Sequence, residues 1–246
     1  MSGDYIGGVL GVLRRIKATQ HLSLQHTSLT YMVEWSGGGD PSAALAMASS
    51  IQEQLRGAQS VIEASSLTTE AKSGLLVTIA GLVNAFSLAG LNGQLAQFIP
   101  ALDPAITNFA IISSLSSSTQ PDSLSQTINN LIRDIDELAD SAKACQMDQV
   151  LRDTIVRNLV ILATMLRNVE AVGIDGAVTS YFDLLVRVRR SEKSASNESK
   201  KSMHGFWPAI NSLGEKIGKI SGLLEAGMKL ISYAEKLPNL LENLQN

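Results

Sequence analysis

The chain has 246 residues, enough for one large domain or two small ones. Its 20 basic residues against 23 acidic ones give a net charge of −3, and aromatic residues make up only 4%, so neither charge nor stacking rings indicate a nucleic-acid-binding protein. Cys145 is the only cysteine, which excludes an intramolecular disulfide and a cysteine-based metal cluster.

Residues 1–39 predict an N-terminal arm with one short helix, over residues 6–17. Apolar residues then alternate from Leu29 to Trp35 before three glycines, a pattern that also allows a strand. Because one strand cannot form a sheet, we expect residues 18–39 to be irregular or partly extended. The first residues lack the basic segment and long apolar run of a secretory signal, which predicts a cytoplasmic protein.

Residues 40–117 predict the first copy of a helical unit. Asp40 followed by Pro41 is a helix start signal, and Thr68 is a suitable N-cap for a second helix. A serine-rich loop follows the unit. We expect helices over 40–64, 67–89, 92–102 and 105–115.

Residues 121–190 predict a second copy. Its first helix begins at Pro121 and has an apolar stripe at three- and four-residue steps. Four acidic residues on this helix occupy its polar side, so we interpret them as a solvated face rather than a carboxylate metal site: Asp134, Asp136, Glu137 and Asp140. Two further helices are expected over 150–172 and 175–190.

The two copies are related by an internal repeat. Residues 90–98 match residues 173–181 with an offset of 83, whereas Ile51 and Ile128 match with an offset of 77. The second copy therefore carries about six extra residues between its helices, which we expect in a loop. The alternative is that two unrelated amphipathic helices end in the same cap.

The corner shared by the copies begins with Gly90 and Gly173. Each glycine is expected to take the left-handed conformation after a helix, and Asn92 and Asp175 to cap the next helix. A phosphate loop is the alternative for this Gly-x-x-Gly pattern. It is disfavoured because no strand precedes the pattern and no lysine follows it.

The stretch from Ser73 to Leu102 contains no ionisable side chain. A solvent-facing helix normally carries charge on its outer side, so this segment predicts either a central buried helix or a membrane span. The corresponding helix of the second copy is charged, which favours a central buried helix. Small residues four apart predict a strip for close helix packing: Gly81, Ala85, Ala89 and Gly93.

Residues 191–204 predict a flexible serine-rich linker. Together with the preceding turn this region is basic, so contact with anionic lipid or an acidic partner is an alternative. Residues 205–246 predict an amphipathic helical tail that begins near Pro208. Its apolar stripe is a candidate surface for a partner or a membrane: Leu213, Ile217, Ile220, Leu224, Met228 and Ile231.

No motif indicates an enzyme. The three histidines show no metal-binding spacing on a helix, and no nucleophile elbow, phosphate-loop lysine or dinucleotide fingerprint is present. We therefore expect no catalytic residues, cofactor or metal, and no small-molecule substrate is identified.

These observations predict an all-α helical bundle or short helical array, built from a duplicated three-helix unit plus a C-terminal amphipathic helix. We expect a non-enzymatic interaction or assembly protein whose uncharged helical surface binds a protein partner or another copy of itself. The alternative is a membrane-active helical effector that associates with, permeabilises or disrupts a bilayer.

Overall fold

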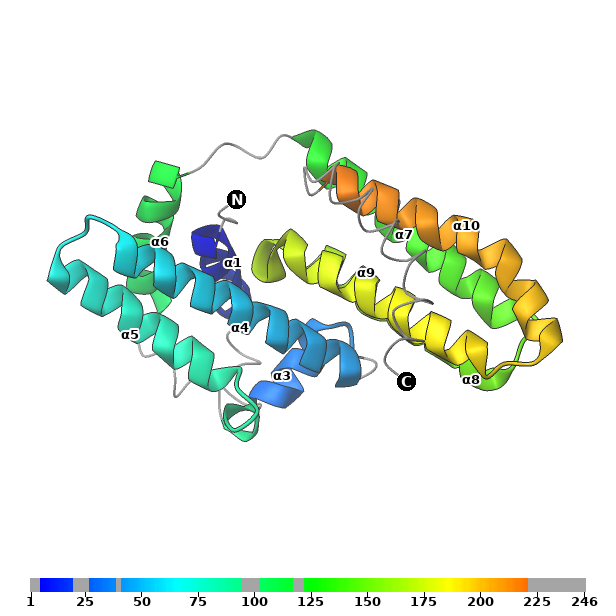
Figure 1. The fold of residues 1–246 in the computed structure, drawn as a ribbon. Coiled ribbons are helices and arrows are strands. Elements are labelled where there is room, and N and C mark those ends of the chain that lie inside the picture. Colours follow the sequence, from blue (N-terminus) through cyan, green and yellow to red (C-terminus); the bar gives the residue numbers. More distant parts are fainter. Residues whose placement is uncertain (1–4, 20–26, 39–40, 94–101, 117–121, 221–246) are drawn as a thin grey trace, which may run out of the picture. The chain divides into compact units, whose positions relative to one another are not determined.

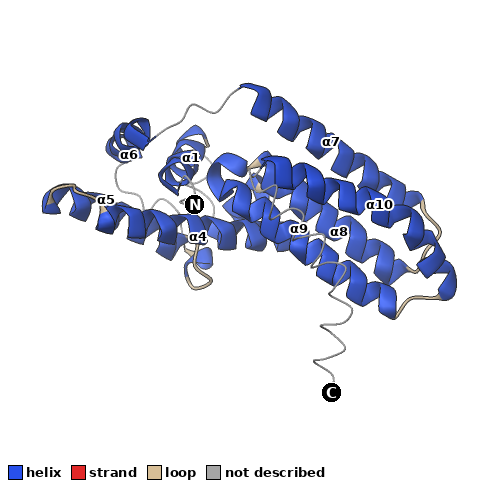
Figure 2. Ribbon diagram, turned by 45° about the horizontal axis from the view of Figure 1, so that its top comes forward, coloured by secondary structure: helices blue, strands red, loops and turns tan. Residues whose placement is uncertain are grey.

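The computed structural model describes residues 5–19, 27–38, 41–93, 102–116 and 122–220 (Figure 1). Each regular element in these residues is a helix, which confirms the all-α fold class (Figure 2). The chain divides into two compact units. Unit 1 contains residues 1–119 and 168–173, and unit 2 contains residues 120–167 and 174–246.

Unit 1 is organised around its first helix. The elements are α1 (Tyr5–Ala18), α3 (Ser28–Trp35), α4 (Pro41–Ala64), α5 (Thr69–Ala85), the 3₁₀ turn η1 (Gly90–Asn92) and α6 (Leu102–Ser116). Helix α1 packs against both α4 and α6, and α4 also packs against α3 and α5. Val9, Val12 and Leu13 of α1 are completely buried, so α1 forms the centre of this unit rather than an arm outside the core.

Two glycines allow the close packing of α1. A Cβ atom at Gly11 would lie 2.6 Å from the backbone oxygen of Glu170, and one at Gly8 would lie 3.0 Å from the side-chain oxygen of Gln54. A backbone carbonyl cannot move aside as a flexible side chain can. Glycine at position 11 is therefore required for α1 to lie against residues 168–173.

Residues 28–35 form helix α3, so the strand considered for this segment is wrong. The side chain of Thr27 caps α3 by accepting a hydrogen bond in its first turn. The alternating apolar residues include Tyr31 and Trp35, whose rings lie 5.7 Å apart, centre to centre, on the same side of the helix. The Trp35 indole N–H donates a 2.7 Å hydrogen bond to the side-chain oxygen of Asn168.

Unit 2 contains α7 (Asp122–Ala144), α8 (Gln149–Arg167), most of α9 (Val169–Lys193) and α10 (Asn197–Ile220). Helices α7 and α8 form an antiparallel pair, and α10 lies along α7 (Figure 1). Lys216 of α10 forms a 2.6 Å ion pair with Asp134, and Arg167 of α8 forms one of the same length with Asp136. The acidic side of α7 thus binds basic groups of neighbouring helices.

The flexible linker expected over residues 191–204 is replaced by a short turn. Helix α9 continues to Lys193 and α10 begins at Asn197, so Pro208 lies inside a helix instead of starting one. Ser196 caps α10, because its hydroxyl accepts the Ser199 N–H. The carboxylate of Asp148, in the loop before α8, accepts the Ser196 N–H at 2.6 Å. The Asp148 N–H donates to the Ser199 hydroxyl, which fastens the two loops together.

The predicted starts of α4 and α5 are confirmed, including the Thr68 cap. Helix α5 ends four residues earlier than expected, at Ala85, and η1 follows it. Most of the helix expected over 92–102 lies outside the described residues, and α6 begins earlier than expected, at Leu102.

The corner glycines differ in conformation. Gly173 is left-handed, with φ of 69°, as predicted, and it kinks α9. The left-handed prediction is wrong for Gly90, which is instead required because the Asn84 carbonyl occupies the space of a Cβ atom. Asn92 ends η1 and does not begin a helix. The loop between α4 and α5, residues 65–68, is as long as the loop between α7 and α8, residues 145–148, so the insertion expected in the second copy does not lie there. The duplication itself stays a prediction.

Two glycines of α10 provide a matched test of packing. A Cβ atom at Gly214 would lie within 2.8 Å of the buried Tyr181 ring, whereas nothing lies within 4 Å of one at Gly205. We expect Gly214→Ala to lower the free energy of unfolding by about 1–3 kcal/mol through overpacking. Gly205→Ala should raise it by up to about 1 kcal/mol, because alanine favours a helix. Chemical denaturation measures both, and equal effects would contradict this packing.

The contacts of the Asp148 carboxylate make the stability of the fold depend on pH. The backbone N–H of Ser196 is the main reason that the pKa of Asp148 lies below its ordinary value; desolvation opposes this, and the hydroxyls of Ser196 and Ser199 add to it. Its carboxylate therefore stabilises the fold above the pKa of about 4 that it has in an unfolded chain. This stabilisation is lost as the pH falls through the lower folded-state pKa.

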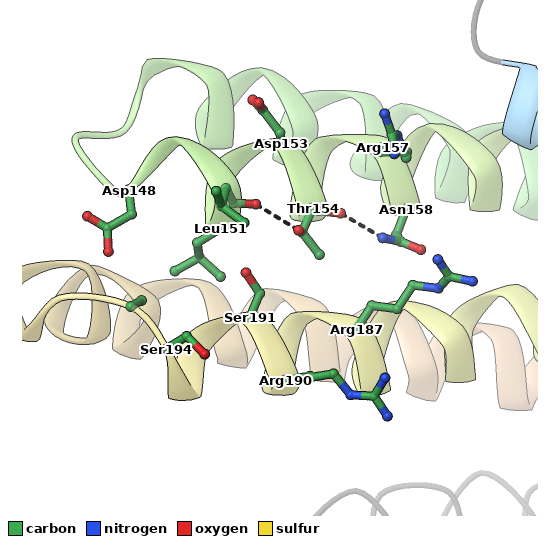
Figure 3. Close-up of a pocket in the computed structure, with 12 residues that line it drawn as sticks. Asp148, Leu151, Asp153, Thr154, Arg157, Asn158, Arg187, Arg190, Ser191 and Ser194 are labelled. Atoms are coloured by element: carbon green, nitrogen blue, oxygen red, sulfur yellow. Dashed lines mark hydrogen bonds between the residues drawn. The ribbon is translucent and has the colours of Figure 1, made fainter.

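We expect Asp148→Asn to lower the melting temperature at neutral pH and to match the wild type in acid. Asp153→Asn is the control, because the Asp153 carboxylate is exposed, lies 3.9 Å from Arg152 and points away from α9 (Figure 3). Thermal melts across a pH series measure both variants. A constant difference for Asp148→Asn at every pH would show that its charge does not hold the turn.

Candidate interaction surface

Helix α5 has two apolar faces, and one of them is buried. Leu75, Ile79, Leu82 and Ala85 follow one another at three- and four-residue steps and are at most 5% exposed. They face α4, α6 and η1, the elements that α5 contacts. This face gives α5 its place in unit 1.

The other face of α5 is exposed. Ser73, Leu76, Val77 and Ala80 line an open hollow of about 490 Å³, and we call these four residues the α5 face. The Val77 side chain is 68% exposed. Sequence patterning favoured a central buried helix here, and that expectation is wrong, because α1 occupies the centre of unit 1.

The α5 face contains no charged side chain. Lys72 lies at its edge, and its ammonium group donates a 2.9 Å hydrogen bond to the backbone oxygen of Glu63. Leu88, which follows α5, is 83% exposed and extends the uncharged segment. The free energy falls when another surface removes neutral apolar side chains of this kind from water.

The small residues predicted to form a packing strip do not lie along one helix, because α5 ends at Ala85. Ala85 is completely buried, and Gly81 is partly exposed. Ala89 is exposed beyond the helix, and Gly93 follows η1, where its oxygen accepts the Ser28 N–H. These positions therefore do not form one strip for close helix packing.

The predicted stripe of the C-terminal tail is only partly available to a partner. Leu213 and Ile217 are buried in unit 2, at 3% and 0% exposed, and therefore belong to its core. Ile220 is the last residue of α10 and is partly exposed. Three members of the stripe lie outside the described residues: Leu224, Met228 and Ile231.

The sequence identified the uncharged segment that contains the α5 face, but not which side of the helix is exposed, although a signal for it is present. Leu75, Ile79 and Leu82 already make a complete buried stripe, yet Leu76, Val77 and Val83 are apolar as well. A helix with more apolar residues than one stripe needs has a second apolar face. Only the packing around α5 shows which face is covered.

Within the described residues, no helix is long and apolar enough to cross a bilayer, and no group of three or more potential ligands could hold a metal ion. Comparison with known proteins finds no matching family model, no matching curated protein and no matching solved structure. The function is therefore inferred from the surfaces of the molecule itself.

Proposed function

We propose that this protein is a non-enzymatic assembly module in which the α5 face binds the α5 face of a second copy. The observation that carries the proposal is the 68% exposed Val77 at the centre of an uncharged helical surface. Sparse charge on an exposed face is unusual for a helix that stays in water.

A second copy suits this face for two reasons. The α5 face has no charge, so two identical faces do not repel each other, as two like-charged faces would. Ser73 and Ala80 are small, and nothing lies within 4 Å of a Cβ atom placed at Gly74, so another helix can approach closely. Two copies related by a twofold axis would place each Val77 against the partner's face.

The free energy expected from burying the α5 face is of the size that gives reversible association. Complete burial of a valine or leucine side chain contributes roughly 1.5–3 kcal/mol. In a twofold dimer the exposed Val77 contributes twice, and the partly exposed Leu76 adds a smaller amount. The loss of translational and rotational freedom offsets part of this gain. We therefore expect an assembly that depends on protein concentration.

The test is a charge placed on the α5 face. We expect Val77→Glu to convert the assembly to a monomer, because the twofold axis brings two glutamates together in an apolar contact. Val160→Glu is the matched control, since Val160 is also an exposed valine, at 37%, and lies on α8 of unit 2. Light scattering after size exclusion measures the mass across a concentration series.

Two results would contradict self-assembly through this face. One is a wild-type protein that stays monomeric at the highest attainable concentration. The other is an assembly that Val77→Glu and Val160→Glu leave equally intact. Melting temperatures of both variants show whether a lost assembly reflects a lost fold.

The membrane-active alternative is supported by Leu88, which is 83% exposed beside the uncharged α5. It predicts dye release from lipid vesicles that Val77→Glu reduces and Val160→Glu does not. A wild-type protein that assembles in solution and leaves vesicles intact would contradict this alternative.

A further inference from the structure

A cleft lies between α8 and α9 within unit 2 (Figure 3). Its volume is about 780 Å³, which is in the range of small-molecule sites in proteins. Leu151, Thr154 and Asn158 of α8 point toward α9, and Ser191 and Arg187 of α9 point back toward α8 (Figure 3). The cleft therefore combines an apolar wall with several polar groups.

One polar group in the cleft has no partner in the described part of the chain. The Ser191 hydroxyl is buried and makes no hydrogen bond. Leaving a buried hydroxyl unpaired costs about 1–3 kcal/mol, so a polar group of a ligand that reaches this hydroxyl from the cleft would be stabilised by it. Asn158 is also buried, at 4% exposed, and its amide is held in place by a 2.7 Å hydrogen bond to the Thr154 oxygen.

The charges of the cleft are separated. Arg187 and Arg190 lie one helical turn apart at one end, and Arg157 of α8 also lines the cleft (Figure 3). Of the two acidic residues that line the cleft, Asp153 points away from α9 (Figure 3) and Asp148 lies at the opposite end, where its carboxylate accepts the Ser196 N–H. Arg187 forms a surface ion pair with the exposed Asp183, 3.8 Å away. Such a pair contributes little free energy, so a phosphate can replace the aspartate.

We propose that this cleft binds an organic phosphate: the phosphate group lies between Arg187, Arg190 and the Ser191 hydroxyl, and its apolar body lies against Leu151. Arginine binds phosphate through paired hydrogen bonds, and a phosphate offers three acceptor oxygens and up to two charges for several donors at once. The site lies in unit 2 and does not depend on assembly through the α5 face.

Binding is measured by calorimetry and by the shift in melting temperature, on the full chain. Naphthyl phosphate is the probe, because it joins a phosphate to an apolar ring system. Naphthol and inorganic phosphate each retain one half of the probe, and we expect both to bind at least roughly tenfold more weakly. Equal binding of inorganic phosphate would overturn the role of the Leu151 wall.

Arginine variants test the charged end of the cleft. We expect the double variant Arg187→Gln with Arg190→Gln to lose roughly tenfold or more in affinity for naphthyl phosphate. Arg133→Gln is the matched control, since Arg133 is an exposed arginine of α7 in the same unit. Equal affinity of the double variant and the wild type would overturn the proposal.

Ser191→Ala separates binding from folding, because the two effects have opposite signs. Without ligand, removal of an unpaired buried hydroxyl should leave the melting temperature unchanged or raise it. With naphthyl phosphate, the same variant should show weaker binding than the wild type. A lower melting temperature without ligand, together with unchanged binding, would show that the hydroxyl serves the fold.

The source of the phosphate group is distinguished by a lipid arm. Flotation with phosphatidylcholine vesicles, with and without phosphatidic acid, tests a lipid headgroup. Binding of naphthyl phosphate without flotation supports a soluble ligand, and binding of both probes that the double arginine variant abolishes supports the same site in a lipid. Binding to neither would overturn the proposal.

Discussion

The central position of α1 is the constraint on which unit 1 depends. Its backbone lies so close to residues 168–173 that a side chain at Gly11 would collide with the Glu170 carbonyl. Because α1 occupies the interior, α4 and α6 pack around it, and α5 packs on α4 at the outside. A helix at the outside can bury only one face, which leaves the α5 face in contact with water.

The proposed function follows from the position of α5 on the outside of unit 1. An outer helix with a charged exposed face is stable in water and needs no further surface to cover it. Helix α5 instead exposes Val77 and Leu76 with no charge among them, and burial of these side chains against an identical face lowers the free energy of the pair. The same features would favour a lipid surface, so the proposed experiments separate assembly from membrane activity.

Unit 2 uses its charged residues differently. Asp134 and Asp136 of α7 bind basic groups of α10 and α8, and Asp148 fastens the loop before α8 to the turn before α10. This last contact holds the ends of α8 and α9 in place. Arg187 and Arg190 lie on α9, where they line a cleft.

Helical periodicity, start signals and caps determined the all-α class, the beginnings of α4 and α5 and the left-handed Gly173, because these depend on neighbours in sequence. The same patterns misjudged residues 28–35, where the alternating apolar residues belong to a helix whose Trp35 binds the distant Asn168. Which helix is central, which face of α5 is covered and which polar groups surround Ser191 depend on contacts between residues far apart in the chain. Only the tertiary structure decides these, because an apolar residue carries no information about which surface will cover it.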